Sequence, residues 1–307
     1  MTLYPPLLKE GDEIMVISPS RKIFSEQMEA SWEIFRSWGL DAREGISLWA
    51  EDGYFAGTDE QRLEEWRQAL ADPAVKAIFC ARGGYGLTRI IDQVELDILH
   101  KHPKWIIGFS DITAVHLALD HANVASIHGL MPAQYGYDNV GESLRSLHQF
   151  LFSGKLHYKI PSVPGNRPGR VTATVIGGNL SLLAESLGTK SEIHTDGRIL
   201  FIEEIDEYLY KIDRMMNQLR RAGKFDRLKG VIVGQFSDMK DTQIPFGKSV
   251  EDILMSYFHG DFPVALNFPI GHENLNLALP FGLPLTLDIT DQMSVLTLDN
   301  QSHLHQG

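Results

Sequence analysis

Apolar residues in the first half of the chain occur in two patterns, which predict strands that alternate with helices. Short apolar runs typical of buried strands cover residues 13–18, 75–81, 105–108 and 124–127. One-sided apolar patterns typical of helices cover 25–38, 58–70, 111–122 and a segment through Ile90 and Ile91. Because alternating strands and helices form a parallel sheet covered on both faces, we predict a flavodoxin-like or Rossmann-like α/β fold here.

The pattern changes after residues 156–170, which are rich in proline and glycine and which we interpret as a linker. Beyond it, strand-like runs and helical patterns occupy 171–176, 198–202, 213–222, 230–236 and 250–258, and residues 283–298 alternate like a pair of strands. We therefore predict two domains. The first covers residues 1–155, and a smaller mixed α/β domain covers 171–307.

Loops at the carboxyl ends of the strands are the expected place for a site in such a sheet. Three loops of the first domain fall there: Ser18–Ser20, Arg82–Gly86 and the turn at Ser110. Polar side chains and glycines gather in these loops. We therefore look for chemistry along this edge.

Ser110 lies at the corner between the strand 105–108 and a helix predicted to begin at Asp111. A serine on such a turn exposes its hydroxyl beside the first N–H groups of the helix. Gly108 precedes it by two residues, as in nucleophile elbows, but Ile112 stands where those elbows carry a second glycine. From this pattern alone, a nucleophile and a simple helix cap both remain open, and caps are the more frequent.

The loop Arg82-Gly83-Gly84-Tyr85-Gly86 lacks the G-x-G-x-x-G spacing of a dinucleotide site, and no ribose-binding acid is evident. Two interpretations remain. The glycines can serve a tight turn that side chains would obstruct. Alternatively, their N–H groups approach an oxygen atom of a substrate.

A serine nucleophile needs a base near pH 7, and the base needs a third group to orient it. Of the 12 histidines, His116 falls on an apolar helical face, His128 follows an apolar run, and His272 lies in a loop after an apolar segment. Glu203 is the first acid after the strand 198–202, in a cluster that is ordinarily a solvated strand end. No H-E-x-x-H motif or paired His/Cys spacing indicates a metal site.

The amino-acid composition argues against some classes of partner and cellular location. The 307 residues are 43% hydrophobic and carry a net charge of −12, which argues against a nucleic-acid partner because phosphates need a basic surface. No apolar run reaches the ~20 residues of a membrane span, and the first residues lack a signal-peptide pattern. The single cysteine, Cys80, lies in an apolar run. We expect it to be a small core residue of a cytoplasmic protein.

Seven motifs in a fixed order carry a resemblance to a known family. They are Phe55-Ala56-Gly57-Thr58-Asp59, Arg82-Gly83-Gly84-Tyr85-Gly86, Gly108-Phe109-Ser110-Asp111, Gly177-Gly178-Asn179-Leu180, Ile202-Glu203-Glu204-Ile205, Tyr210-Lys211-Ile212-Asp213-Arg214 and Gly271-His272. Together they span nearly the whole chain. The sequence resembles the LD-carboxypeptidase family of serine peptidases, which also contains the microcin C immunity peptidase.

This resemblance implies a catalytic triad with Ser110 as nucleophile, His272 as base and Glu203, rather than its neighbour Glu204, as the orienting acid. The first domain would supply the serine, and the second domain would supply the other two residues. The resemblance also implies a homodimer in the cytoplasm. We expect no metal or other cofactor, because the sequence shows no cluster of metal ligands. The expected substrate is murein tetrapeptide, cut at the L,D bond before its terminal D-alanine during cell-wall recycling.

The same resemblance implies an oxyanion hole formed by backbone N–H groups of Asp111 and of the Gly83-Gly84 loop. Arg82 is the nearest candidate in sequence for binding the free carboxylate of a terminal D-alanine. Two other functions stay open: cleavage of an acyl-adenylate amide, and non-catalytic ligand binding on the same fold. The immunity branch of the family looks aromatic after its Gly-Gly-Asn motif. Residues 180–195 contain no Phe, Tyr or Trp, which argues against a nucleotide. The stretch departs from the carboxypeptidase branch too, where we expect an aromatic residue near Lys190 to Ile193, so it counts against a nucleotide more than it favours murein.

Overall fold

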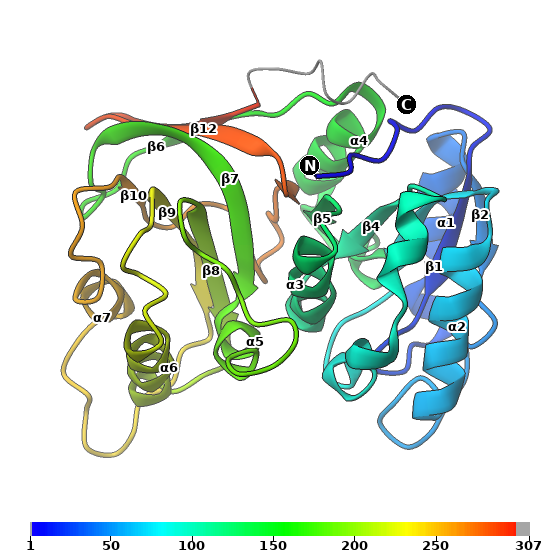
Figure 1. Ribbon diagram of the computed structural model, residues 1–307, viewed down its shortest axis with the longest axis horizontal. Coiled ribbons are helices and arrows are strands. Elements are labelled where there is room, and N and C mark those ends of the chain that lie inside the picture. Colours follow the sequence, from blue (N-terminus) through cyan, green and yellow to red (C-terminus); the bar gives the residue numbers. More distant parts are fainter. Residues whose placement is uncertain (1, 299–307) are drawn as a thin grey trace. The chain divides into compact units, whose positions relative to one another are not determined.

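The computed structural model describes residues 2–298, which form two compact units. Of these residues, the first unit contains 2–155 and Asn274–Gly282, and the second contains Leu156–Glu273 and 283–298. Each unit combines one sheet with helices (Figure 1), so the predicted α/β class is confirmed. No helix in the described part of the chain has the length and apolar character that a membrane crossing requires.

The first unit is built on a six-stranded sheet with the order β11-β5-β4-β3-β1-β2. Its strands are β1 (Glu13–Ile17), β2 (Asp41–Glu44), β3 (Val75–Cys80), β4 (Trp105–Gly108), β5 (Ser126–His128) and β11 (Leu279–Phe281). The first five are parallel, and only β11 runs antiparallel, along β5. The carboxyl ends of β1, β3 and β4 therefore lie next to one another in the order β4, β3, β1.

Four α-helices belong to this unit: α1 (Glu29–Ser37), α2 (Asp59–Ala71), α3 (Thr113–His121) and α4 (Gly141–Ser153). Helix α2 begins at the predicted capping box, in which Thr58 accepts a hydrogen bond from the backbone N–H of Gln61. The continuous helix predicted through Ile90 and Ile91 is wrong. The chain there forms two short 3₁₀ turns, Leu87–Arg89 and Ile91–Gln93. Further 3₁₀ turns cover Ser25–Gln27, Leu96–His100, Ser110–Ile112 and Pro132–Gln134.

Two predicted core positions of this unit are confirmed. Cys80 is a free, fully buried thiol at the end of β3. His116 is buried on α3, and its ring nitrogens lie 2.8 Å from Ser126 Oγ and 2.9 Å from the carbonyl oxygen of Gly108. Burial lowers the pKa of His116 to about 4, so this ring is neutral near pH 7.

The second unit is built on a seven-stranded sheet with the order β10-β9-β8-β7-β12-β13-β6. Its strands are β6 (His157–Pro161), β7 (Gly169–Asn179), β8 (Ile199–Ile205), β9 (Gly230–Ser237), β10 (Val264–Ala265), β12 (Pro284–Ile289) and β13 (Met293–Thr297). The long strand β7 pairs antiparallel with β12 over its first six residues and parallel with β8 over its last five, Val175–Asn179. The helices are α5 (Leu180–Glu185), α6 (Leu209–Arg221) and α7 (Val250–Met255).

The units differ from the predicted division of the chain at two places. Residues 156–170, predicted as a linker, contain the edge strand β6 and the start of β7, both within the second sheet. Alternating half-buried and exposed residues and a terminal Pro161 fit an edge strand, but the proline and glycine content conceals this pattern. Residues Asn274–Gly282 return to the first unit, where β11 extends the sheet and Phe281 packs on His116.

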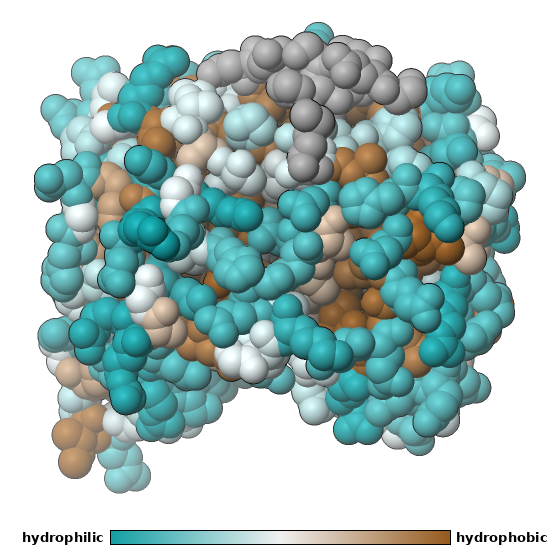
Figure 2. Space-filling view, in the orientation of Figure 1, coloured by the Kyte–Doolittle hydropathy of each residue, from teal (hydrophilic) through white to brown (hydrophobic). Residues whose placement is uncertain are grey.

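Hydrophilic residues cover most of the face drawn in Figure 2, and apolar residues show there in separate patches. This surface agrees with a chain in which 22% of residues are charged.

Candidate functional site

Glu203 and His272 form a hydrogen-bonded pair in the second unit. Nδ1 of His272 lies 2.7 Å from Oε2 of Glu203. The side chain of Glu203 is 0% exposed, whereas that of His272 is 13% exposed. The pair therefore leaves the imidazole edge as the part that can meet a substrate, while the carboxylate is shielded from water. The interpretation of Glu203 as part of a solvated strand end is wrong.

The chain segment before His272 is fixed against the carboxyl end of β9. Gln235 donates its backbone N–H to the carbonyl oxygen of Ile270 at 2.9 Å, and its side-chain Oε1 accepts from the N–H of Glu273 at 3.1 Å. Gly271 has a φ of +149°, and a Cβ there would lie 3.0 Å from Cβ of Gln235. Glycine is thus needed for the turn that presents His272.

Glu204 has a different role from its neighbour. Its carboxylate accepts hydrogen bonds from the Asn179 side chain at 2.7 Å and from the N–H and Oγ of Ser181 at 2.8 and 2.6 Å. It also accepts from the N–H of Ile205 at 2.9 Å. These contacts join the end of β8 to the start of α5. Adjacent strand residues point to opposite faces, which explains why two neighbouring acids serve two purposes.

The imidazole of His272 experiences two opposing influences. Burial is the largest single influence and lowers its pKa. The charge and the hydrogen bond of Glu203, together with a smaller contribution from the charge of Glu204, raise the pKa, and the net value lies above the usual 6.5. A buried carboxylate on Nδ1 also selects the tautomer that carries a proton there. The other nitrogen, Nε2, can then accept a proton from a hydroxyl.

Ser110 occupies the predicted corner of the first unit, between β4 and α3. Its φ is +63°, which is unusual for a residue with a Cβ and costs about 1–3 kcal/mol. Helix α3 starts after Ile112 without a side-chain capping hydrogen bond, so the cap interpretation has no support at this start. Strained backbone of this kind is common where a side chain must point into a site.

Gly83 lies directly against this serine. A Cβ on Gly83 would lie 3.1 Å from Cβ and 3.3 Å from Oγ of Ser110. The close approach explains a glycine at this position. Gly84, with a φ of +119°, continues the loop toward the carboxyl end of β1.

The side chain of Asp111 ties together the three loops of this edge. Its buried Oδ2 accepts from Ser20 Oγ at 2.6 Å and from the N–H of Leu87 at 3.0 Å. Ser20 follows β1 and Leu87 follows the glycine loop. The residue after the serine therefore holds the loops that follow β1 and β3 in fixed positions.

Two buried ionisable side chains of α2 support the same loops, and neither was predicted from the sequence. Arg62 donates to the carbonyl oxygens of Pro19 and Gly86 at 2.8 and 2.9 Å. Glu65 accepts from the N–H groups of Ser18 and Ser47, each at 3.1 Å, and burial raises its pKa to about 7. The sequence contained a pattern that could have indicated these two residues. Charged residues that recur among Leu63, Trp66 and Ala69 interrupt the apolar face of this helix.

The predicted site residues therefore fall into two groups. The glycine loop, Ser110 and Asp111 lie together in the first unit, and Glu203 and His272 lie together in the second. Each group lies where strands of its own sheet end. Among residues 2–298, no cluster of three or more His, Cys, Asp or Glu side chains is arranged to hold a metal ion.

Comparisons with known proteins agree with this arrangement of motifs. Residues 14–129 match the LD-carboxypeptidase N-terminal domain, and residues 172–287 match the LD-carboxypeptidase C-terminal domain. The chain is 33% identical to the probable murein peptide carboxypeptidase of Bacillus subtilis, over 95% of this chain and 93% of that protein. The chain belongs to the LD-carboxypeptidase family. The resemblance drawn from the seven motifs is thereby confirmed, and membership in a family of carboxypeptidases supports a peptidase.

Solved structures share this fold. The crystal structure of muramoyltetrapeptide carboxypeptidase from Oxalobacter formigenes aligns with a TM-score of 0.86 at 27% identity, covering 94% of this chain and 99% of that one. The microcin C7 self-immunity protein MccF, in complex with aspartyl sulfamoyl adenosine, aligns with a TM-score of 0.85 at 22% identity. That alignment covers 97% of this chain and 99% of that chain. At this identity, the likeness to MccF concerns the fold alone.

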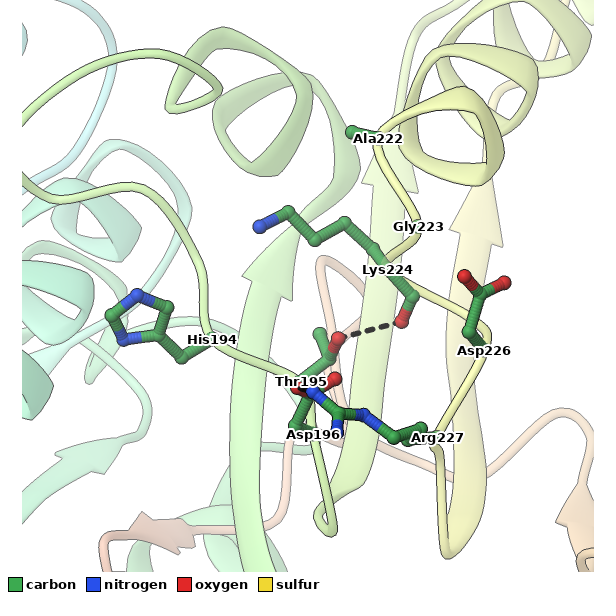
Figure 3. A pocket seen from close by; sticks show the side chains of 8 residues that line it. All are labelled: His194, Thr195, Asp196, Ala222, Gly223, Lys224, Asp226 and Arg227. Atoms are coloured by element: carbon green, nitrogen blue, oxygen red, sulfur yellow. Dashed lines mark hydrogen bonds and ion pairs between the residues drawn. The ribbon is translucent and has the colours of Figure 1, made fainter.

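Figure 3 shows one open pocket of this LD-carboxypeptidase family member. It has a volume of about 530 Å³ and lies in the second unit, where its lining includes Lys224 and Arg227. Thr195 Oγ1 donates to the carbonyl oxygen of Lys224 at 2.6 Å. The two cations pair with Glu192 and Asp196 respectively. The lining residues precede β8 and β9, whereas Glu203 and His272 lie where strands end, so this pocket belongs to the opposite edge of the sheet.

We predict that Glu203→Gln lowers the pKa of His272 to below 6.5, because burial then acts without the opposing carboxylate. NMR titration of the His272 ring, assigned with a His272→Gln variant, measures this change. Glu204→Gln is the matched control and should shift the pKa much less, since that carboxylate contributes least. An unchanged pKa in Glu203→Gln would contradict the assigned coupling.

The sign of the linked stability follows from the raised pKa. Charged His272 contributes stability that is fully present below pH ~6.5, and this contribution is lost as the pH rises through the folded-state pKa.

Proposed function

We propose that this protein is a serine carboxypeptidase that removes the terminal D-alanine from murein tetrapeptide. The triad would consist of Ser110, His272 and Glu203. The observation that carries the proposal is the 2.7 Å hydrogen bond between His272 and a fully buried Glu203. A histidine oriented in this way is the base that a serine hydroxyl requires. The strained corner at Ser110 supports the assignment of the nucleophile.

In the proposed reaction, Ser110 Oγ attacks the carbonyl carbon of the L,D bond while Nε2 of His272 accepts the hydroxyl proton. Glu203 stabilises the resulting imidazolium through Nδ1. Backbone N–H groups of Asp111 and of the Gly83-Gly84 loop would bind the oxyanion. His272 then returns the proton to the amine of the departing D-alanine, which leaves an acyl-enzyme on the serine.

Water completes the proposed cycle. His272 accepts a proton from a water molecule as that water attacks the ester carbonyl. It then returns the proton to Ser110 Oγ, which regenerates the serine hydroxyl as the bond to the peptide breaks. Every step uses only groups of this chain and water. The reaction therefore calls for no metal or other cofactor.

The substrate class rests on the relatives and on composition. Relatives named as murein peptide and muramoyltetrapeptide carboxypeptidases support a murein peptide. An acyl-adenylate needs a surface for its base, and base stacking on aromatic residues contributes ~1–3 kcal/mol in nucleic-acid binders. The stretch 180–195 offers no aromatic side chain. Arg82 would bind the free carboxylate of D-alanine, and we further propose a cytoplasmic homodimer by resemblance to the family.

We predict that Ser110→Ala lowers kcat by about 10³-fold or more while the protein still folds, because the substitution removes the nucleophile but little packing. Release of D-alanine from murein tetrapeptide measures turnover, and thermal unfolding checks the fold. The exposed Ser25→Ala is the matched control and should leave kcat unchanged. Near-normal turnover by folded Ser110→Ala would refute the nucleophile assignment.

We predict that Gln substitutions of the two neighbouring acids have opposite relative effects on kcat and on the melting temperature. Glu203→Gln should reduce kcat steeply, since it removes the charge that stabilises imidazolium. Glu204→Gln should reduce kcat less but lower the melting temperature more, because its carboxylate accepts four hydrogen bonds. Both quantities are measured on the same preparations. A larger loss of kcat in Glu204→Gln would show that the acid is assigned one residue too early.

We predict that murein tetrapeptide is cleaved, its C-terminal amide is cleaved poorly, and an aminoacyl sulfamoyl-adenosine is cleaved far more slowly than the tetrapeptide. The kcat/KM values for the three compounds decide between substrate classes. Equal cleavage of acid and amide would refute a carboxylate requirement. Preference for the adenylate would favour an immunity-type function, and cleavage of none by folded protein would favour a binding protein.

A further inference from the structure

Arg21 lies at the edge of the first sheet that also carries Ser110 and the glycine loop. It follows β1 by four residues, Arg82 follows β3 by two, and Ser110 follows β4 by two. Since β4, β3 and β1 are consecutive in the sheet, these three positions are consecutive along its carboxyl edge. The edge therefore places two arginines on the same side of the nucleophile.

The position of Arg21 is determined by contacts with the glycine loop and with Tyr54. A Cβ on Gly84 would lie 2.8 Å from Cβ of Arg21 and 3.0 Å from the hydroxyl of Tyr54. The Arg21 guanidinium lies 5.1 Å from the centre of the Tyr54 ring, within the range of a cation–π contact. Backbone pairing of Arg21 with Phe55 holds the two segments together.

Neither arginine has an acidic partner. Within residues 2–298, no carboxylate lies within ion-pair distance of Arg21 or Arg82. Several other arginines of this unit are paired, among them Arg89 with Asp59 at 2.7 Å, and Arg43 with Glu13 at 2.7 Å and Asp72 at 2.9 Å. The chain contains 40 acidic residues, so acids are plentiful. Two neighbouring cations without a counter-charge form a local positive site on a protein of net charge −12.

The surroundings of Arg82 agree with a charge that no carboxylate compensates. Burial lowers the pKa of Arg82, and repulsion from Arg21 lowers it further. The other titratable groups that act on it are the hydroxyls of Tyr137 and Tyr54, and none is a carboxylate. An anion bound between the two guanidinium groups would relieve both the repulsion and the cost of burial.

We propose that Arg21 and Arg82 together bind the free carboxylate of the residue that the enzyme releases, with Tyr54 as the wall that holds Arg21 in place. This inference rests on the proposed function and adds Arg21 as a specificity-determining residue that the sequence did not reveal. Planar guanidinium groups match a carboxylate in geometry as well as in charge. Discrimination between a free acid and its amide thus depends on two cations rather than on Arg82 alone.

The test compares Arg21→Gln with the wild type on murein tetrapeptide and on its C-terminal amide. We expect the ratio of kcat/KM for acid over amide to fall at least about tenfold, mainly through KM for the acid, while the amide is cleaved as before. Arg21→Lys should retain part of the ratio. Arg36→Gln is the matched control, because it removes the same charge from an exposed position at the end of α1 and should leave the ratio unchanged.

An Arg21→Gln variant that keeps the wild-type ratio would overturn the inference while leaving the proposed function intact. If the wild type cleaves neither compound, the proposed function fails, and calorimetry with Ser110→Ala still tests the carboxylate site. In that measurement, tetrapeptide should bind at least about tenfold more weakly to Ser110→Ala/Arg21→Gln than to Ser110→Ala. Equal affinity of the two variants would overturn the inference.

Discussion

The proposed catalytic chemistry depends first on the hydrogen bond between His272 and Glu203. A carboxylate with 0% exposure is expensive to hold in its charged form unless a partner compensates it. The imidazole supplies that partner at one oxygen, and among the described residues the other oxygen, Oε1, is buried without a hydrogen bond. The second unit therefore accepts a cost in stability at this position. That cost strengthens the influence of Glu203 on the histidine, because little water screens the charge.

The first unit meets a different constraint, since it must hold a strained serine and three loops in fixed relative positions. Asp111 links these loops, because one of its carboxylate oxygens accepts hydrogen bonds from Ser20 Oγ and from the N–H of Leu87. Arg62 and Glu65 of α2 also bind the loop after β1, and their burial strengthens these polar contacts. Buried polar and ionisable side chains thus help to hold these loops in place. Those buried contacts leave Arg21 and Arg82 without acidic partners at the same edge.

Sequence patterns predicted the parallel sheet and the corner at Ser110 because strand and helix periods are local properties. Nothing local distinguishes Glu203 from Glu204, and the resemblance to a family was needed to choose between them. The return of Asn274–Gly282 to the first unit and the edge strand β6 were missed, since pairing between distant segments leaves little trace in composition. Arg21 was missed for a similar reason. Its significance comes from its neighbours in space, Gly84 and Tyr54, and from the lack of an acidic partner in the described part of the chain.

The most direct test of the central claim is labelling with a fluorophosphonate, followed by peptide mapping by mass spectrometry. If Ser110 is a nucleophile activated by His272, the wild type should carry one adduct on Ser110, and folded His272→Ala should label far more slowly. An adduct on another serine, or labelling of Ser110 at the same rate without His272, would contradict the account. Persistent absence of labelling in folded wild-type protein would contradict it as well.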